Sequence, residues 1–365
     1  LMKLPLLQSA DPERPVLWTH GHALSARELM REVASVAGAL PADARYVINL
    51  CERRDDFLIA FCAALVRGHT NLLPSSRAAG VVDEVAALNP GSYRCDDDFV
   101  ARASAQAATG GVSGAAAAGD AAPRAAQDSA AVLGADANTL CAFELPAEHV
   151  AVKAFTSGST GTPQAHLKFW RSFAGSTAQN AMRIRECLTP RYGTVRPWIV
   201  ATVPPQHMYG LELSVLLPMV TELAVHAGRP FFPDDVARAL SDIPAPRVLV
   251  TTPVHLRALV ESGVALPPLV GIVSATAPLA QEVAAAAEAR FGGEVREMFG
   301  STETCVFAVR RTALEAAWTP LPGVRLETQA AGTLVHAPHL ATPVLLADMM
   351  DVAADGTFQV RGRQA

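Results

Sequence analysis

The chain has 365 residues, of which half are hydrophobic and 18% are charged, and its formal net charge is −5. This length is sufficient for one large domain or for several smaller ones with substantial cores. The negative charge argues against a nucleic-acid-binding surface, which requires a basic field.

Neither the cysteines nor the apolar segments indicate a metalloprotein or a membrane protein. The six cysteines lie far apart and form no CxxC pair, which argues against a zinc site or a redox couple. The best apolar run, FLIAFCAALV at 57–66, has about half of the ~20 residues that a membrane span needs. No signal peptide is recognisable in LMKLPLLQSADPERP. We therefore expect a soluble, cytoplasmic protein with reduced thiols.

The first part of the chain predicts a βαβ unit. In the helix expected at 25–40, Ser25 and Glu28 have capping-box spacing, and apolar residues recur at helical intervals. Three elements follow in the order strand, helix, strand, at 46–50, 55–68 and 69–74. This order predicts a parallel sheet.

Residues 101–137 are rich in alanine and glycine and almost lack large apolar side chains. We expect part of this segment to be a flexible or loosely helical surface excursion. An alanine-rich helix is the alternative, and periodicity does not decide between the two.

Short β-branched runs alternate with helical patterns in the later chain. Strands are expected at 196–205, 223–228, 247–253 and 270–278. Near the end, VRLET, GTLVHAP, TPVLLAD and GTFQVRG are separated by short turns. They predict a small antiparallel sheet or barrel.

A glycine-rich loop lies within FTSGSTGTPQAHLK, residues 155–168, after a strand-like segment at 152–155. Its hydroxyl groups are hydrogen-bond donors, and its glycines allow backbone N–H groups to approach a phosphate closely. These residues are Thr156, Ser157, Gly158, Ser159, Thr160 and Gly161. A solvated linker is the alternative. The patterns GxxxxGK[ST] and GxGxxG are absent, so neither a P-loop nor a dinucleotide-binding fold is indicated.

Together with four later segments, this loop resembles the acyl-adenylate-forming (AMP-dependent synthetase/ligase) superfamily, in which the loop reads TSGSTGxPK. VPPQHMYG (203–210) is similar to PxxHxxG, and SATAPL (274–279) stands where the family has GGAPL. EMFGSTET (297–304) is similar to YGxTE, and LADMMDVAADGTFQVRGR (346–363) to TGDxxxxDxDGxxxxxGR. The resemblance extends over nearly the whole chain.

The resemblance implies the α/β fold of the N-terminal domain of these enzymes. We expect two βαβ-type parallel-sheet subdomains, at 1–175 and 176–318, and a small C-terminal antiparallel β subdomain at 319–365. The mobile C-terminal domain of the family, with its adenylation lysine, is expected to be absent after RGRQA. The chain would then be an excised domain or a naturally short nucleotide-binding protein.

The implied activity is the ATP-dependent conversion of a carboxylic acid to an acyl-adenylate, followed by transfer to a thiol. By resemblance, residues 156–161 hold the β- and γ-phosphates, and Glu303 holds Mg²⁺, which prefers carboxylate oxygen. The other nucleotide contacts would be Phe299 on adenine, Thr302 on the α-phosphate, Asp348 and Arg363 on ribose, and Ala275, Thr276, Ala277, Gly300 and Ser301. With His207, Thr302 and Glu303 form the expected catalytic set.

The acid-binding pocket is expected to be mainly apolar or small, lined by His207, Met208, Leu211, Ser274, Ala275 and Met298. No aspartate stands out there to bind an amino-acid ammonium group, with Asp234 and Asp235 as the exceptions. An aryl or acyl acid is therefore expected, with an acyl carrier protein or coenzyme A as the thiol partner. The pattern FTSGSTGxPxxxxKxW, which ends with Lys168 and Trp170, also resembles that of the acid ligases of bacterial aryl-polyene pathways.

Departures from the family pattern leave a second function open, that of a nucleotide-binding regulatory or pseudoenzyme module. Gln164 replaces the family's lysine, for which Lys168 is a candidate substitute, and Ala275 and Thr276 replace two glycines. Each site residue also has a structural alternative. Glu303 would be a solvated charge, Asp348 a turn cap, and His207 and Phe299 core residues. We expect His166, His226, His255 and His336 to be structural.

Overall fold

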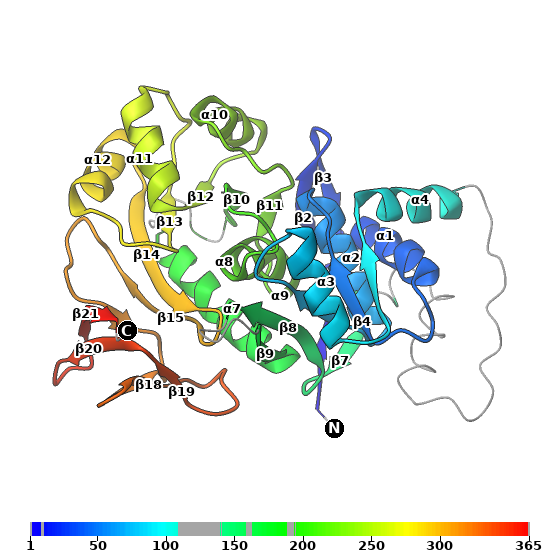
Figure 1. Cartoon of the computed structure of the whole chain (residues 1–365). Coiled ribbons are helices and arrows are strands. Elements are labelled where there is room, and N and C mark those ends of the chain that lie inside the picture. Colours follow the sequence, from blue (N-terminus) through cyan, green and yellow to red (C-terminus); the bar gives the residue numbers. More distant parts are fainter. Residues whose placement is uncertain are drawn as a thin grey trace. The chain divides into compact units, whose positions relative to one another are not determined.

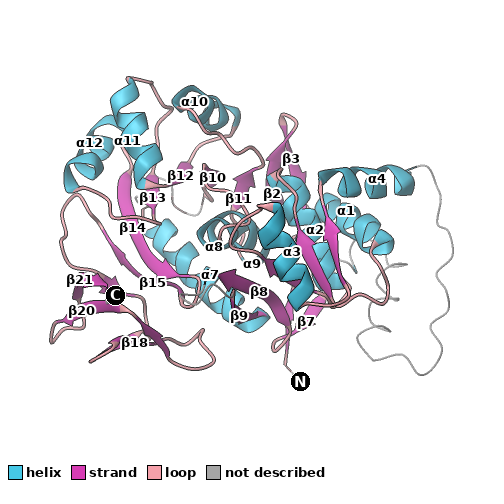
Figure 2. Ribbon diagram, viewed as in Figure 1, coloured by secondary structure: helices cyan, strands magenta, loops and turns pink. Residues whose placement is uncertain are grey.

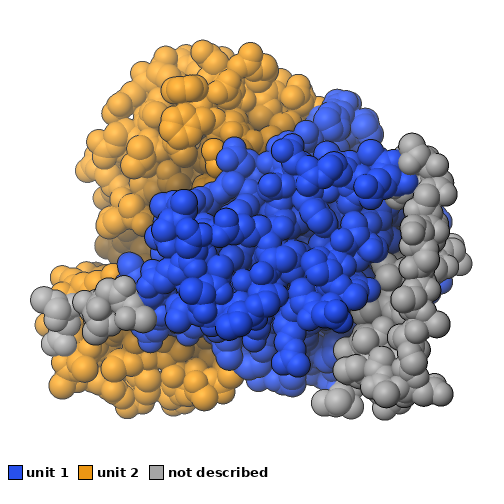
Figure 3. All heavy atoms as spheres, turned by 45° about the vertical axis from the view of Figure 1, so that its right-hand side comes forward, with its two compact units in different colours: residues 1–171, 205–207, 218–222 blue, residues 172–204, 208–217, 223–365 orange. Residues whose placement is uncertain are grey.

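The computed structural model describes residues 2–8, 11–108, 139, 141–157, 163–187, 193 and 195–363. The chain divides into two compact units, shown in different colours in Figure 3. Unit 1 contains residues 1–171, 205–207 and 218–222. Unit 2 contains residues 172–204, 208–217 and 223–365.

Unit 1 is built on one mixed sheet. Its elements are β1 (Lys3–Pro5), β2 (Pro15–Thr19), β3 (His22–Ser25), α1 (Ala26–Ala39), β4 (Tyr46–Asn49), α2 (Arg54–Val66), β5 (Thr70–Leu73), α3 (Ala79–Leu88), β6 (Ser92–Cys95), α4 (Asp97–Ala108), β7 (Glu144–Pro146), β8 (Val150–Thr156) and β9 (Gln164–Phe169). The sheet order is β6-β4-β5-β8-β9, with β9 alone antiparallel to its neighbour. β2 and β3 form a hairpin, and β1 pairs with β7.

Two helices of unit 1 form for reasons visible in the sequence. α1 begins with a capping box. Ser25 Oγ accepts from the Glu28 amide at 3.2 Å, and the Glu28 carboxylate accepts from the Ser25 amide at 2.8 Å. α2 is buried along nearly its whole length, which explains its apolar run. In the described part of the chain, no helix combines the length and the apolarity required to span a bilayer.

The alanine-rich segment is only partly described. Its first residues, 101–108, continue α4, and residues 109–137 lie outside the described residues. The expected choice between a flexible excursion and a longer helix therefore stays open for residues 109–137.

Unit 2 is built on a longer sheet and contains most of the elements after β9, while residues 218–222 belong to unit 1. From residue 170 onward the elements are α7 (Trp170–Glu186), β10 (Trp198–Ala201), α8 (Met208–Leu211), the π-helical turn η1 (Glu212–Leu216), α9 (Leu217–Val220), β11 (Ala224–His226), α10 (Pro233–Asp242), β12 (Arg247–Thr251), α11 (Pro253–Ser262), β13 (Gly271–Ser274), α12 (Gln281–Phe291), β14 (Glu294–Ser301), β15 (Cys305–Arg310), β16 (Thr319–Pro320), β17 (Arg325–Gln329), β18 (Gly332–His336), β19 (Val344–Leu346), β20 (Asp348–Val352) and β21 (Phe358–Arg363).

Five neighbouring strands of this sheet, in the order β11-β10-β12-β13-β14, run parallel. β15 and β16 extend the sheet in the antiparallel sense. α10, α11 and α12 follow one another along one side of unit 2 (Figures 1 and 2). All five parallel strands therefore present their carboxyl ends at one edge, where open α/β sheets bind ligands.

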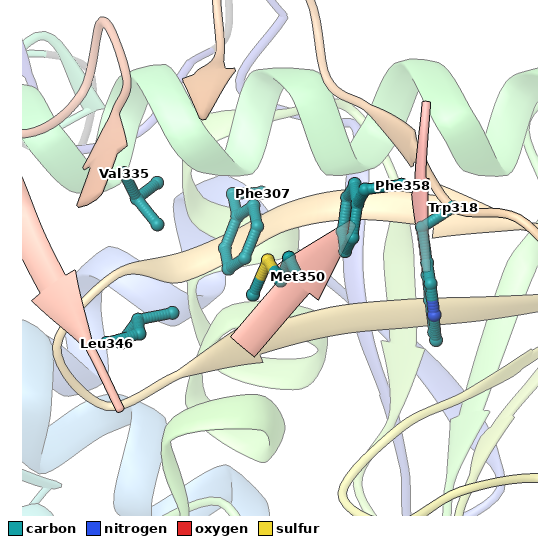
Figure 4. Close-up of a cluster of buried hydrophobic side chains, with 7 residues drawn as sticks. Phe307, Trp318, Val335, Leu346, Met350 and Phe358 are labelled. Carbon is teal, nitrogen blue, oxygen red and sulfur yellow. The ribbon is translucent and has the colours of Figure 1, made fainter. Parts of the chain in front are cut away.

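The end of unit 2 forms two small antiparallel sheets, β17-β18-β19 and β20-β21. Buried side chains join them to β15, as Figure 4 shows for Phe307, Trp318, Val335, Leu346, Met350 and Phe358. The parallel sheets and these antiparallel sheets confirm the expected α/β fold class.

A buried group of titratable side chains lies at the amino ends of β5 and β8 in unit 1. Nδ1 of His69 lies 2.9 Å from the hydroxyl oxygen of Tyr93. His149 Nε2 donates to the His69 carbonyl at 3.2 Å. Burial, reinforced by Arg67, lowers the pKa of His69 to about 4, and burial also lowers the pKa of His149. The imidazole of His69 is therefore neutral in the folded protein at pH 7.

We predict that His69 makes the protein less stable in mild acid. Its pKa is lower when folded than when unfolded, so the unfolded chain binds the extra proton between pH 6.5 and about 4. The contribution of neutral His69 is complete above pH 6.5 and is lost as the pH falls through this window. The expected slope is at most about 1.4 kcal/mol per pH unit.

The measurement is the free energy of unfolding by urea from pH 4.5 to pH 7.5, for the wild type and for His69→Gln. The difference between the two curves isolates His69. This matters because burial and Asp55 raise the pKa of Asp56 to about 7, which contributes a slope of opposite sign in both proteins. Parallel curves would contradict the prediction.

Candidate functional site

The expected phosphate loop begins at the end of β8 in unit 1. β8 and β9 form an antiparallel hairpin in which Thr156 is paired with Gln164. Thr156 Oγ1 lies 3.1 Å from His166 Nε2, and Ser157 is exposed. The other expected loop residues, Gly158, Ser159, Thr160 and Gly161, lie outside the described residues.

The expected acid-pocket residues lie around α8. His207 is exposed and directly precedes this helix, in which Met208 and Leu211 are buried. Gly210 has a steric role, because a Cβ there would lie 2.0 Å from the carbonyl oxygen of Pro204. The Tyr209 hydroxyl donates to the carbonyl of Val273 at the end of β13, at 3.1 Å.

The central part of the site is the carboxyl edge of β13 and β14 in unit 2. β13 and β14 are neighbouring strands (Figure 1), and Ser274, the last residue of β13, is the register partner of Glu297 in β14. Ala275, Thr276 and Ala277 follow directly after β13, and residues 298–301 end β14. The structure therefore brings together two segments that the sequence analysis identified separately.

Hydroxyl side chains continue this edge on the neighbouring strands. Thr251, at the end of β12, is the register partner of Ser274. Its Oγ1 lies 3.0 Å from Oγ1 of Thr202, which is 3.0 Å from Nδ1 of His255. His255, expected to be structural, thus belongs to a row of polar side chains with Thr202 and Thr251.

Glu297 fixes the loop after β13, and the sequence analysis missed it. Its side chain is 2% exposed. One carboxylate oxygen accepts from the Leu279 amide at 2.9 Å. The other accepts from Arg310 Nε at 2.8 Å and from Thr312 Oγ1 at 2.6 Å. The Arg310 guanidinium also lies 4.4 Å from the centre of the Trp318 ring. The sequence signal was weak, because Glu297 is one of two acids in a strand that also contains Arg296.

Thr276 has a left-handed backbone conformation, with φ of +85°. This region favours glycine and is costly for a β-branched residue. Thr276 stands where the resembled family has a glycine, and its side chain is exposed. The structure therefore supplies a physical reason for a glycine at this position and shows that the present chain forms the turn without it.

Thr302 and Glu303 lie, partly buried, in the turn between β14 and β15. Ser301 and Thr304 close this turn, because each amide donates to the hydroxyl of the other, at 3.1 and 3.2 Å. The buried His339 donates from Nε2 to the Thr304 carbonyl at 2.8 Å. His339, like Glu297, was missed because its partner is distant in the sequence.

The turn could hold Mg²⁺ only with the help of substrate oxygens. Among the residues that the structure describes, no group of three or more His, Cys, Asp and Glu side chains is arranged to hold a metal ion. Mg²⁺ is commonly bound by one or two carboxylates together with phosphates and water. Glu303 fits such a site as its single carboxylate.

Phe299 is partly buried against three aromatic rings. Its ring centre lies 5.3 Å from that of Phe307, 5.1 Å from Trp318 and 6.0 Å from Phe358. These contacts fix the orientation of the ring and agree with its alternative as a core residue. A contact with adenine stays a prediction.

Asp348 and Arg363, fifteen positions apart, are register partners in β20 and β21. Arg363 Nε lies 4.0 Å from Asp348 Oδ2. The Thr333 hydroxyl donates to the Asp348 carbonyl at 2.8 Å. The antiparallel hairpin thus places both expected ribose contacts side by side.

Comparisons with known proteins agree with this arrangement. A model of the family "AMP-binding enzyme" matches residues 8–338. The chain is 32% identical over 167 residues to a 4-coumarate–CoA ligase of Rhodobacter capsulatus, and 30% identical over 220 residues to one of Halorhodospira halophila. These matches cover 46% and 57% of this chain and 41% and 49% of the two relatives. The chain therefore spans about half the length of these curated relatives.

Among solved structures, the chain is similar to O-succinylbenzoate coenzyme A synthetase of Bacillus subtilis. The complex with ATP and magnesium matches with a TM-score of 0.75 and 14% identity, over 99% of this chain and 80% of that one. At this identity the similarity establishes the fold, which is the expected N-terminal fold of adenylate-forming enzymes.

We predict that Thr276→Gly stabilises the protein by about 1 kcal/mol, because it removes the left-handed strain. The measurement is the free energy of unfolding by urea. Ala277→Gly is the matched control, since Ala277 has no positive φ, and it should destabilise by about 0.5–1 kcal/mol. Equal effects of the two substitutions would contradict the strain.

We predict that Gly300→Ala destabilises the protein by about 1–3 kcal/mol, because the added Cβ would lie 2.3 Å from the carbonyl oxygen of Cys305. Gly175→Ala in α7 is the control. Its Cβ would make an ordinary contact of 3.6 Å, so we expect no loss of stability. Similar urea midpoints for both variants would refute the steric argument.

Proposed function

Because the chain belongs to the AMP-binding enzyme family, we propose that it carries the nucleotide- and acid-binding residues of an AMP-forming acid–thiol ligase. The observation that supports this most directly is the parallel pairing of β13 with β14. This pairing sets the loop after Ser274 beside the segment that leads to Thr302 and Glu303. An anionic ligand at this edge would meet backbone and hydroxyl groups from two strands.

The proposed first reaction joins two anions. A carboxylate oxygen of the acid attacks the α-phosphorus of ATP, the bond to the bridging β-phosphate oxygen breaks, and pyrophosphate leaves. The protein must hold the reactants in line and offset their charge. In this proposal the Thr302 hydroxyl donates a hydrogen bond to an α-phosphate oxygen, and Glu303 holds Mg²⁺. Bound Mg²⁺ would supply positive charge at the phosphate oxygens.

In the second reaction a thiol attacks the acyl carbonyl carbon, AMP leaves, and the thiol proton is released. The two curated relatives are coenzyme A ligases. We therefore propose coenzyme A as the first acceptor to test and an acyl carrier protein as the alternative. The aryl-polyene ligases use an acyl carrier protein as the acceptor. For this chain, that alternative is supported only by the resemblance at Lys168 and Trp170.

An aryl or acyl acid fits the proposed pocket better than an amino acid. Met208, Leu211 and Met298 are apolar and buried. Asp234 and Asp235, the expected exceptions, begin α10, and Asp235 binds the Phe232 amide at 3.3 Å and Arg238 at 2.6 Å. These contacts support a helix-capping role for Asp235. The named activity of the curated relatives favours an aromatic acid.

Gln164 is the residue that favours the second function, that of a nucleotide-binding module without adenylation. It is exposed and neutral at the position where the resembled family has lysine. Exchange of labelled pyrophosphate into ATP separates the two functions. An adenylating protein shows exchange that depends on fatty, benzoic or cinnamic acids. The module binds ATP and AMP but shows no exchange with any of these acids.

We predict that Asp348→Ala weakens AMP binding at least about tenfold, because the ribose would lose a charge-assisted hydrogen bond. Calorimetry with AMP measures the change. Asp351→Ala is the matched control, since Asp351 lies on the same strand and is paired with Arg361. It should leave AMP binding unchanged. If both variants bind AMP like the wild type, the ribose role of Asp348 is wrong.

A further inference from the structure

A histidine that the function has not used lies at the start of the phosphate loop. β8 and β9 form an antiparallel hairpin (Figure 1), in which Ala154 is paired with His166 and Thr156 with Gln164. Side chains two residues apart share one face of a strand. Thr156 and His166 are therefore diagonal neighbours on the same face, and their Oγ1 and Nε2 atoms lie 3.1 Å apart.

The hydrogen bond has a consequence for Thr156. A threonine hydroxyl has one proton to donate and two lone pairs that accept. When the imidazole carries its proton on Nε2, the ring donates to Oγ1. The single hydroxyl proton of Thr156 then stays available for an anionic oxygen.

Lys168 is less suited to assist this loop. It is 4% exposed and is the register partner of Val152, well inside the hairpin. It is four positions from Gln164, which corresponds to about 13 Å along a strand. His166 is closer to the loop and contacts its first hydroxyl directly. Of the two, the observed geometry favours His166.

We propose that His166 is a positioning residue of the triphosphate site, which orients the Thr156 hydroxyl toward the terminal phosphates of ATP. This inference rests on the proposed function, in which residues from Thr156 onward hold the β- and γ-phosphates. Gln164 brings no charge to this region. The chain would depend on an oriented hydroxyl where related loops have a lysine.

The test compares the effect of each substitution on the affinity for ATP with its effect on the affinity for AMP, because AMP lacks the terminal phosphates. We expect His166→Leu to weaken ATP binding by about 3- to 10-fold, the value of one hydrogen bond, without a change in AMP binding. His166→Gln offers a side-chain amide at a similar reach and should restore most of the ATP affinity. Calorimetry with ATP and with AMP on the 365-residue chain measures both.

A double-mutant cycle tests whether His166 acts through Thr156. Thr156→Val alone should weaken ATP binding, and adding His166→Leu to it should cause little further loss. Fully additive losses would overturn the proposal, since His166 would then act independently of the hydroxyl.

His149→Leu controls for a loss of stability. His149 directly precedes β8, at the opposite end of the strand from Thr156, and donates to a backbone carbonyl. At a comparable loss of unfolding free energy it should leave the affinities for ATP and AMP unchanged. An equal effect of His149→Leu on ATP binding would overturn the proposal, because the effect would then be one of general stability.

The remaining outcomes separate the two proposals. If the wild type binds both nucleotides and His166→Leu binds ATP equally well, or loses ATP and AMP equally, the role of His166 is wrong and the proposed function stands. If the wild type binds neither nucleotide, the proposed function fails and this inference fails with it.

Discussion

The buried carboxylate of Glu297 is the interaction on which the site in unit 2 depends. Parallel pairing brings the ends of β13 and β14 to one edge, but a sheet edge alone does not fix the loop that follows. Glu297 does so, because it accepts from the Leu279 amide on one side and from Arg310 and Thr312 on the other. Such a carboxylate is tolerated in the interior because its oxygens are fully engaged by donors.

Further contacts extend this rigid frame to the turn that carries Thr302 and Glu303. His339 bonds to the turn from the small sheets, and the buried Glu212 in η1 accepts from the Val306 amide at 3.4 Å. Asp348 and Arg363 face one another because they are register partners at the open end of the β20–β21 hairpin. Unit 2 thus carries these polar side chains on backbone segments that hydrogen bonds from neighbouring elements fix in position. Such rigidity is what preorganised groups require.

Much of this architecture could be predicted from the sequence, because it depends on local patterns. The capping box of Ser25 and Glu28 and the short β-branched runs predicted elements that the structure contains. The ordered motifs also predicted the family, which the match over residues 8–338 confirms. Glu297, His339 and the contact of His166 with Thr156 could not be predicted in this way, because each depends on a partner that only folding or strand register brings near. The left-handed backbone of Thr276 was hidden for a different reason, since the residue type argues against it.

Arg310 is shared between two neighbours, as its guanidinium binds the carboxylate of Glu297 and covers the ring of Trp318. Its two contacts differ in chemistry, one being ionic and the other aromatic, and both depend on the same guanidinium group. Substitutions at these three positions are therefore expected to be non-additive. A change of Arg310 would therefore reach both the buried acid and the aromatic cluster around Trp318 at once.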